Sequence, residues 1–176
     1  DVSGMTKEEA KAAVDEYMAS KAEEKITLMV EDHELDVSRE ALGVVWDNEF
    51  VIDEALALGK SGNVIKRYKA LKDLEFDNKV YELEYTADSQ LIQTIVSEKC
   101  TKYNRKAVNT GLKKTGSGFE VIGGTQGVAV NESAAAGVIL DYIENEYDGV
   151  TGKITIPTVV VEPIGSAEEL AKVKDL

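Results

Sequence analysis

Few residues in this chain are of the types that carry out chemistry. The sequence has one histidine, His33, and one cysteine, Cys100. His33 stands in a predicted acidic turn, where exposure to solvent is the ordinary outcome, and Cys100 falls on the apolar side of a predicted helix, where a thiol acts as a small hydrophobic group. Pairs of carboxylates such as Asp141 and Glu144 arise by chance on an acidic helix. An enzyme with an acidic site is therefore the weakest of three functional alternatives, and the two stronger ones are given at the end of this subsection. We predict no catalytic residues.

Metal and cofactor sites are also not indicated. Asp32, Glu34 and Asp36 alternate as in a calcium loop, but the glycine and the distal glutamate of that loop are missing, which favours a solvated acidic turn. No Cys/His spacing suggests zinc. The glycines at 116–118 and 123–124 do not lie between a strand and a helix, as those of a phosphate-binding motif do. We therefore predict no metal and no cofactor.

The one concentration of positive charge in the chain lies between residues 99 and 114. It comprises Lys99, Lys102, Arg105, Lys106, Lys113 and Lys114, with Tyr103 and Asn104 among them. Cations can pair with a ligand carboxylate, and a tyrosine ring can stack on a sugar face. We predict ligand-binding residues at Tyr103, Arg105, Lys113 and Lys114, because about eight residues join the helix end to the lysine loop and keep them near each other. A solvated surface is the alternative.

Composition sets the broad class. The chain has 176 residues, 43% of them hydrophobic, and a net charge of -13. Such an anionic surface argues against nucleic-acid binding, which needs clustered lysine and arginine. Neither a transmembrane run nor a signal peptide is visible. The chain starts at Asp1 rather than at a methionine, so we interpret it as a fragment that would contact a membrane only through a missing N-terminal anchor.

The first half of the sequence predicts helix, hairpin, helix. Thr6 and Glu9 form a capping box that opens a helix over 7–22. Strands at 26–30 and 35–37 follow as a hairpin, and a short helix at 52–58 ends at Gly59. Periodicity does not decide between helix and strand for residues 63–74.

The second half repeats that order with a strand on each side. Alternation predicts a strand over 80–85, and Asp88 caps a helix that leads to Cys100. Strands at 106–110 and 119–122 flank the lysine loop as a hairpin. Asn131 caps the next helix, and Pro157 interrupts a final extended run, which places that run at an edge or bulge.

These elements predict an α+β fold made of two αββα-type modules, with helices packed on one face of a mostly antiparallel sheet. We expect an N-terminal module at 1–75, a second module at 76–165, and a linker at 166–176 to a missing C-terminal domain.

Three segments carry a family resemblance. Phe119 to Ile122 form an aromatic-led strand, Gly127 follows, and Val130-Asn131 opens a helix. This outline resembles the peptidoglycan-binding domain that precedes the catalytic domain in many Gram-positive L,D-transpeptidases and occurs in VanW-like surface proteins. Residues 2–10, VSGMTKEEA, and residues 55–63, ALALGKSGN, are similar to segments of the same proteins.

The resemblance implies a non-catalytic module that binds, or is positioned on, peptidoglycan at the surface or in the wall of a Gram-positive bacterium. The partner would be a glycan strand or a peptide stem. The alternative is a structural spacer that positions a downstream catalytic domain through protein contacts. The two sequence segments that carry the transpeptidase active site, H-G-T/S and S-x-G-C-[IV]-R, are absent from the chain, which agrees with a module without catalysis.

Overall fold

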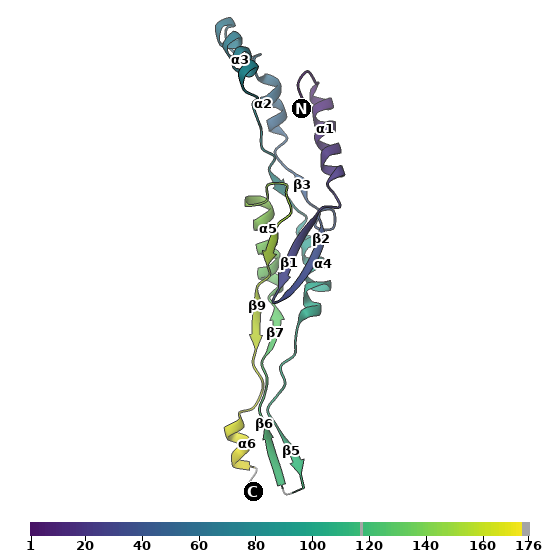
Figure 1. Ribbon diagram of the computed structural model, residues 1–176, viewed down its shortest axis with the longest axis vertical. Helices are drawn as coiled ribbons and strands as arrows, with labels where there is room; N and C mark the ends of the chain where they lie inside the picture. Colours follow the sequence, from purple (N-terminus) through teal and green to yellow (C-terminus); the bar gives the residue numbers. More distant parts are fainter. Residues whose placement is uncertain (117, 174–176) are drawn as a thin grey trace.

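The molecule is long and thin, with its elements arranged in tiers along one axis. In the computed structural model, which describes residues 1–116 and 118–173, three helices lie at one end, a sheet and two helices form the middle, and a hairpin with a short helix lies at the other end (Figure 1). The first residues of the chain lie at the three-helix end and the last described ones at the hairpin end.

The described helices are α1 (Lys7–Ser20), α2 (Phe50–Ala57), α3 (Val64–Phe76), α4 (Ser89–Glu98), α5 (Glu132–Asn145) and α6 (Ala167–Val173), with a 3-10 turn η1 (Cys100–Tyr103). The described strands are β1 (Lys25–Val30), β2 (His33–Ser38), β3 (Val45–Trp46), β4 (Tyr85–Thr86), β5 (Gly111–Thr115), β6 (Gly118–Ile122), β7 (Gly127–Val130), β8 (Lys153–Thr155) and β9 (Thr158–Val161).

The middle of the molecule is built on the three-stranded sheet β2-β1-β8. β1 pairs antiparallel with β2 and parallel with β8, so Leu28 lies opposite both Leu35 and Ile154. Every second residue of β1, namely Ile26, Leu28 and Val30, is buried. This period of two is what a strand with one covered face requires.

Helices α4 and α5 pack against each other and close the core under this sheet. Asp88 and Asn131 cap them as predicted, with side-chain oxygens that accept from backbone amides of the first turns. The apolar stripe of α4, which includes Ile92 and Val96, meets that of α5, which includes Ile139. Most of the buried hydrophobic side chains lie in this middle tier.

Helix α1 begins at a capping box and is tied to other elements by polar contacts, among them ion pairs of Lys7 with Asp53 and of Lys11 with Glu49 on the side of α2. The predicted capping box is present: the Thr6 amide donates to Glu9 Oε2 (2.8 Å) and the Glu9 amide to Thr6 Oγ1 (3.3 Å). The backbone hydrogen bond from Thr6 lowers the pKa of the Glu9 carboxyl. Near the other end, Trp46 Nε1 donates to Asp15 Oδ1 (2.9 Å), which ties α1 to β3. The helix ends at Ser20, slightly earlier than predicted.

A buried arginine joins several elements of the middle tier. Arg39 is only 2% exposed, and its guanidinium lies 5.6 Å from the ring centre of Tyr85 and 5.4 Å from that of Tyr147. Its Nη1 is 3.8 Å from Glu24 Oε2, and its Nη2 approaches Met18 Sδ at 3.3 Å. A cation held between aromatic faces away from water is stabilised by the ring quadrupoles.

Beyond the middle tier the molecule narrows to a stalk of extended segments that ends in the hairpin. β7 pairs with β9, and isolated bridges join Arg105 to Val128 and Val108 to Thr125. β5 and β6 form the terminal hairpin beside α6. Gly127 makes the crossing possible, because a Cβ there would lie 2.3 Å from the Arg105 carbonyl oxygen.

The predicted α+β class is confirmed, but the arrangement of its strands differs from the prediction. The strands form four small sheets, β2-β1-β8, β3-β4, β5-β6 and β7-β9, instead of one layer covered by helices. The two predicted αββα units also differ from each other, since the β1–β2 hairpin lies in the middle tier while the β5–β6 hairpin projects to one end (Figure 1). Residues 63–74, undecided in sequence, belong to helix α3.

Two predicted strands were wrong in part. Only Tyr85 and Thr86 of the segment around 80–85 form a strand; residues 80–84 alternate in exposure as predicted, but the side chain of Asn48 takes their hydrogen bonds at Glu82 and Glu84. The hairpin strand lies at Gly111–Thr115 rather than at 106–110, so Lys113 and Lys114 belong to β5 and not to a loop. His33 likewise begins β2 instead of lying in the turn.

The sheet of the middle tier joins segments from both sides of the boundary expected near residue 75. Ile154 of β8 pairs with Leu28 of β1, and Arg39 contacts Tyr147 of the later segment. The division into modules at 1–75, 76–165 and 166–176 stays a prediction.

Candidate functional site

Helix α4 presents a polar face opposite its buried one. Asp88 Oδ1 accepts from the amides of Gln90 (2.7 Å) and Leu91 (3.2 Å), which fixes the start of the helix. The spacing i, i+3, i+4, i+7 then places four uncharged polar side chains in one row. They are Gln90, Gln93, Thr94 and Ser97.

The first turns of α5 lie across from this row. Asn131 Oδ1 accepts from the Ala134 amide (3.2 Å), so the helix begins at Glu132. Glu132, Ser133 and Ala136 thereby face the polar row of α4. Ala136 keeps the two helices close, because it adds little bulk between them.

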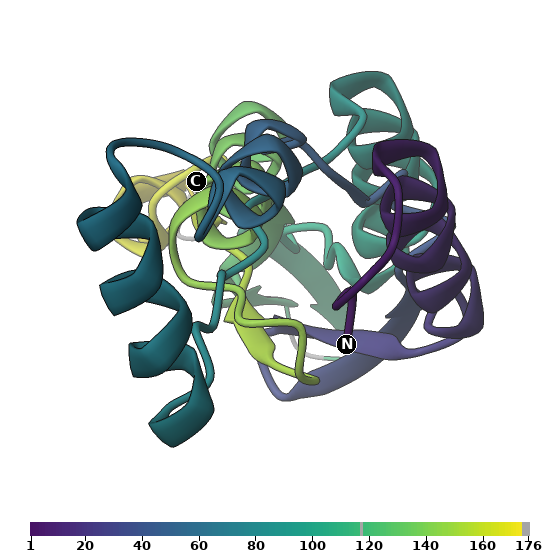
Figure 2. The ribbon, with the colours of Figure 1, turned by 90° about the horizontal axis from the view of Figure 1, so that it is seen from above.

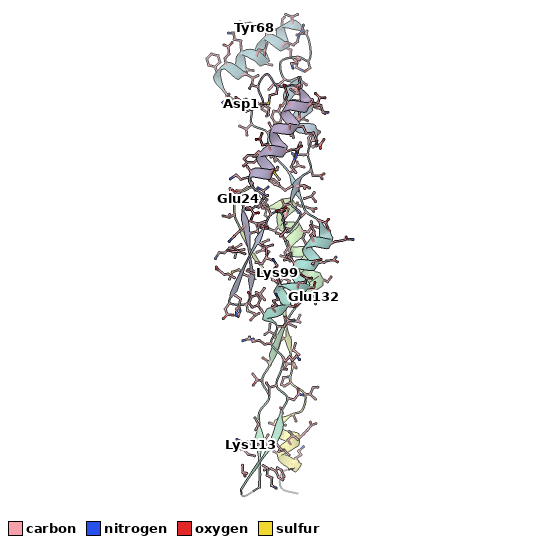
Figure 3. All side chains as sticks on the ribbon, turned by 90° about the vertical axis from the view of Figure 1, so that its right-hand side faces the viewer. Asp1, Glu24, Tyr68, Lys99, Lys113 and Glu132 are labelled. Atoms are coloured by element: carbon pink, nitrogen blue, oxygen red, sulfur yellow. The ribbon has the colours of Figure 1, made fainter. Side chains whose placement is uncertain are left out.

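The two rows line an open groove with a volume of about 640 Å³. We call it the α4–α5 groove. It lies on the middle tier, where Figure 3 labels Glu132 beside the helix that ends near Lys99. Since its walls are two helices anchored in the core, the groove is preformed by the fold.

The chemistry of the α4–α5 groove is that of amides and hydroxyls with one carboxylate. Thr94 Oγ1 donates to the Gln90 carbonyl (2.9 Å) and Ser97 Oγ to the Thr94 carbonyl (3.1 Å), so both hydroxyl oxygens keep lone pairs for a ligand. The amide groups of Gln90 and Gln93 supply donors and acceptors. Such a surface can exchange hydrogen bonds with sugar hydroxyls, N-acetyl groups or peptide amides.

Of the residues predicted to bind ligand, Tyr103 is partly used by the fold. Its ring lies half-buried in η1, with its centre 4.6 Å from that of His33. The His33 Nδ1 also lies 2.9 Å from Asp32 Oδ1. One face of Tyr103 therefore packs on the end of the β1–β2 hairpin, which sequence reasoning did not foresee.

The structure separates the predicted cations. Arg105 is exposed beside β7, with its backbone bonded to Val128. Lys113 and Lys114 lie on the terminal hairpin, and Figure 3 shows Lys113 near one end of the molecule, far from Lys99. As neighbours in a strand the two lysines point to opposite faces, Lys113 beside Glu120 and Lys114 beside Phe119. The expectation that helix end and lysines would meet at one ligand is wrong, because the intervening chain runs extended.

Cys100 is fully buried, and this burial raises the pKa of its thiol to about 11. At neutral pH the sulfur is protonated, and a thiol of this kind is a poor nucleophile. The prediction that it serves as a small hydrophobic residue agrees with its place in the core.

The acidic residues of β2 form ion pairs with neighbouring lysines. Glu34 pairs with Lys153 (2.6 Å), and Asp36 lies 3.8 Å from Lys25 while accepting from Thr27 Oγ1 (2.9 Å). Among residues 1–116 and 118–173 no group of three or more histidine, cysteine or acidic side chains is arranged to hold a metal ion. Within the same ranges no helix is both long and apolar enough to cross a bilayer.

Comparison with protein families decides what kind of domain this is. A family model described as "Putative peptidoglycan binding domain" matches residues 35–150. The chain belongs to this family. The matched region includes most of β2, both walls of the α4–α5 groove, the stalk strand β7 and the terminal hairpin. Searches of curated proteins and of solved structures each gave no match.

The chain is therefore a peptidoglycan-binding module associated with the cell wall. The α4–α5 groove was missed at the level of sequence, although a signal was present. Four uncharged polar residues at helical spacing on α4 are an unusual run in a chain with 30% charged residues. What sequence could not give is the wall formed by α5, more than thirty residues later.

Proposed function

We propose that this chain is a non-catalytic module of a larger VanW-like or L,D-transpeptidase-type surface protein, and that it binds peptidoglycan on a Gram-positive cell. The observation that carries the proposal is the family match over residues 35–150. A buried thiol whose pKa is raised to about 11 is consistent with a module that does no chemistry of its own.

The α4–α5 groove is the surface that we assign to the ligand. Its amides and hydroxyls suit the N-acetylated sugars and amide-linked stems of peptidoglycan, which offer many neutral donors and acceptors. Individual hydrogen bonds of this type contribute about 1 kcal/mol each, so several must act together. The open form of the groove suits a polymer that enters and leaves at its ends.

Tyr103 and Arg105 follow α4 outside the groove, and Lys113 and Lys114 lie on the terminal hairpin; we assign each pair a further contact with the ligand. An exposed ion pair with a stem carboxylate contributes up to about 1 kcal/mol. A long polymer could bridge both surfaces, and the two contacts would then reinforce each other.

The shape of the molecule favours one other role. Its first and last described residues lie at opposite ends of the long axis (Figure 1). An elongated body joined in this way sets a distance between the parts that it connects. A spacer that positions a downstream catalytic domain through protein contacts is thus the second candidate.

Retention on purified sacculi separates these roles. We expect the wild-type chain to sediment with sacculi at physiological salt. The variant Gln93→Ala/Ser97→Ala/Ser133→Ala should lose at least fivefold in retention, and Arg105→Ala/Lys113→Ala/Lys114→Ala should lose retention at low salt. A matched control, Lys66→Ala/Lys69→Ala/Lys79→Ala, removes the same charge at the opposite end and should bind as the wild type does.

Each outcome has a defined meaning. Absence of the wild-type chain from the pellet would reject binding and favour the spacer. Full retention of the groove variant, with loss in the basic variant alone, would move the site to the stalk and hairpin. Release of labelled fragments from the sacculi would show catalysis and overturn the proposal.

A further inference from the structure

Helix α3 leaves its large apolar side chains uncovered. None of its residues is buried, and Val64, Ile65, Tyr68 and Phe76 are exposed by 70%, 79%, 63% and 89%. At about 100° per residue these four side chains fall within an arc of about 120° on the helix. A soluble helix normally turns such an arc toward a core. Here the arc has no partner among the described residues.

The same helix is basic in an acidic protein, so the chain has a second concentration of positive charge besides the one expected between residues 99 and 114. Residues 60–79 contain six of the chain's 20 basic residues and only three of its 33 acidic ones, which gives this segment a net charge of +3 within a chain of -13. At the same 100° per residue, Lys69 borders the apolar arc and Lys72 lies within it. The Lys72 ammonium lies 6.0 Å from the ring centre of Tyr68 and pairs with Glu75 Oε2 at 2.8 Å, and its long stem can cover apolar surface.

The helix also lies at one end of the molecule and across its axis. Figure 1 shows α3 at the extreme of the three-helix end, and Figure 3 shows it running across that end near the label of Tyr68. In the view from above, α3 is seen along its full length and stands apart from the other helices (Figure 2). Its axis is thus roughly perpendicular to the long axis of the chain.

We propose that α3 is an interfacial helix that binds an anionic lipid surface. A helix with bulky apolar residues on one side and lysines around them lies in the plane of a membrane, with its apolar side among the lipid headgroups. The lysines bind lipid phosphates, which the acidic remainder of the chain would repel. Lipid is favoured over a second copy of the chain because Lys69 and Lys72 lie at and within the apolar arc, and because the net charge of +3 over residues 60–79 is opposite to that of an anionic surface.

This binding mode has a geometric consequence. Because α3 lies across the end, a bilayer that holds it in its plane would hold the long axis of the protein away from the surface. The α4–α5 groove and the terminal hairpin would then stand at increasing distance from the lipid. The proposal does not depend on the assignment of the groove and tests a different surface.

Flotation with lipid vesicles tests the proposal. The probes are vesicles of phosphatidylcholine with 30% phosphatidylglycerol, and vesicles of phosphatidylcholine alone. We expect the chain to float with the anionic vesicles and to bind at least tenfold less to the neutral ones. Ile65→Ser/Phe76→Ser and Lys69→Gln/Lys72→Gln should each reduce binding at least fivefold without changing the melting temperature, because none of these side chains is buried.

A matched control carries the same kind of change elsewhere. Val159→Ser/Val160→Ser removes two exposed apolar side chains from β9 and should float as the wild type does. Hydrogen exchange of the α3 amides should slow on addition of anionic vesicles. Equal binding to both vesicle types, no binding, or unchanged binding of both α3 variants would overturn the proposal. A dimer in solution that Ile65→Ser/Phe76→Ser dissociates would assign the face to a second copy instead.

Discussion

The middle of this molecule and its two ends obey different physical rules. In the middle tier, Ile26, Leu28, Ile92 and Ile139 are fully removed from water, and even the charged Arg39 is enclosed. At the ends, α3 has no buried residue and Phe119 of the terminal hairpin is 50% exposed. Burial of apolar surface contributes roughly 25 cal/mol per Å², so the middle tier supplies most of the stability. The exposed side chains at the ends are therefore less constrained by the stability of the fold than those of the middle tier.

The largest expected effect is truncation of a core side chain. Ile139→Ala should lower the free energy of unfolding by about 4 kcal/mol, because it removes a fully buried side chain and leaves a cavity. Ile122→Ala, at a position 46% exposed on the hairpin, should cost less than about 1 kcal/mol. Urea denaturation measures both. Equal losses would mean that the ends contribute to stability as much as the middle.

Arg39 tests whether the enclosed charge follows the same rule. Arg39→Ala should cost about 3 kcal/mol, since it empties the space between Tyr85 and Tyr147 and removes the ion pair between Arg39 and Glu24. Arg39→Met keeps most of the volume and should cost clearly less. Melting curves of the two variants give the comparison. If methionine is as damaging as alanine, the charge itself and not the packing holds these elements together.

Alkaline pH should weaken the middle tier selectively. Burial raises the pKa of Cys100 to about 11 and that of Tyr147 to about 12. The folded protein holds these protons more tightly than the unfolded chain does, so their contribution is complete below about pH 9 and is lost as the pH rises toward 12. A shift of about two pKa units corresponds to a loss on the order of 2–3 kcal/mol for each of the two groups across this window.

Cys100→Ala provides the control for that titration. It removes the group that begins to titrate first in the unfolded chain, so the decline in melting temperature should begin nearer pH 10 than pH 9. A decline that begins at the same pH in both proteins would show that Cys100 does not contribute.

The smallest effect is expected at the junction between the middle tier and the stalk. Gly127→Ala places a Cβ 2.3 Å from the Arg105 carbonyl oxygen and 2.4 Å from the Ala107 nitrogen. The segments around residues 105–107 and 127 must therefore separate, at a cost of about 1–2 kcal/mol. Gly111→Ala meets no atom within 4 Å and should be neutral. Hydrogen exchange at the amide of Val128 reports the difference locally. Unchanged protection of that amide would show that the crossing adapts without cost.

The elements that the sequence could predict are those that depend on residues close together in the chain. The capped helices were found because Thr6, Asp88 and Asn131 act on residues only two or three positions away. The segment at 80–84 has the alternation of a strand, but a strand also needs a neighbouring strand to bond with. Here the side chain of Asn48 bonds to the backbone of Glu82 and Glu84 instead. Local signals thus gave the elements, whereas pairing between distant segments could not be inferred from them.

The candidate site likewise combines a part that is local in the sequence with a part that comes from a distant segment. The polar row on α4 is local and can be read from residues 90–97, but the opposing wall comes from α5. The lysines at 113 and 114 were expected to lie near the helix end because few residues join them. Bridges of Arg105 to Val128 and of Val108 to Thr125 hold that joining segment extended instead.

The parallel pairing of β1 with β8 has a mechanical consequence. The chain enters β1 from the three-helix end and leaves β8 toward the hairpin end (Figure 1). Tension applied between the two ends would therefore pull these strands past each other in shear, and the hydrogen bonds from the Thr27 amide to Gly152 and from the Ile156 amide to Met29 would share the load. Strands sheared in this way must give up their bonds together, whereas the terminal hairpin can peel open one pair at a time. The middle tier should therefore stay folded at a tension that already opens the terminal hairpin.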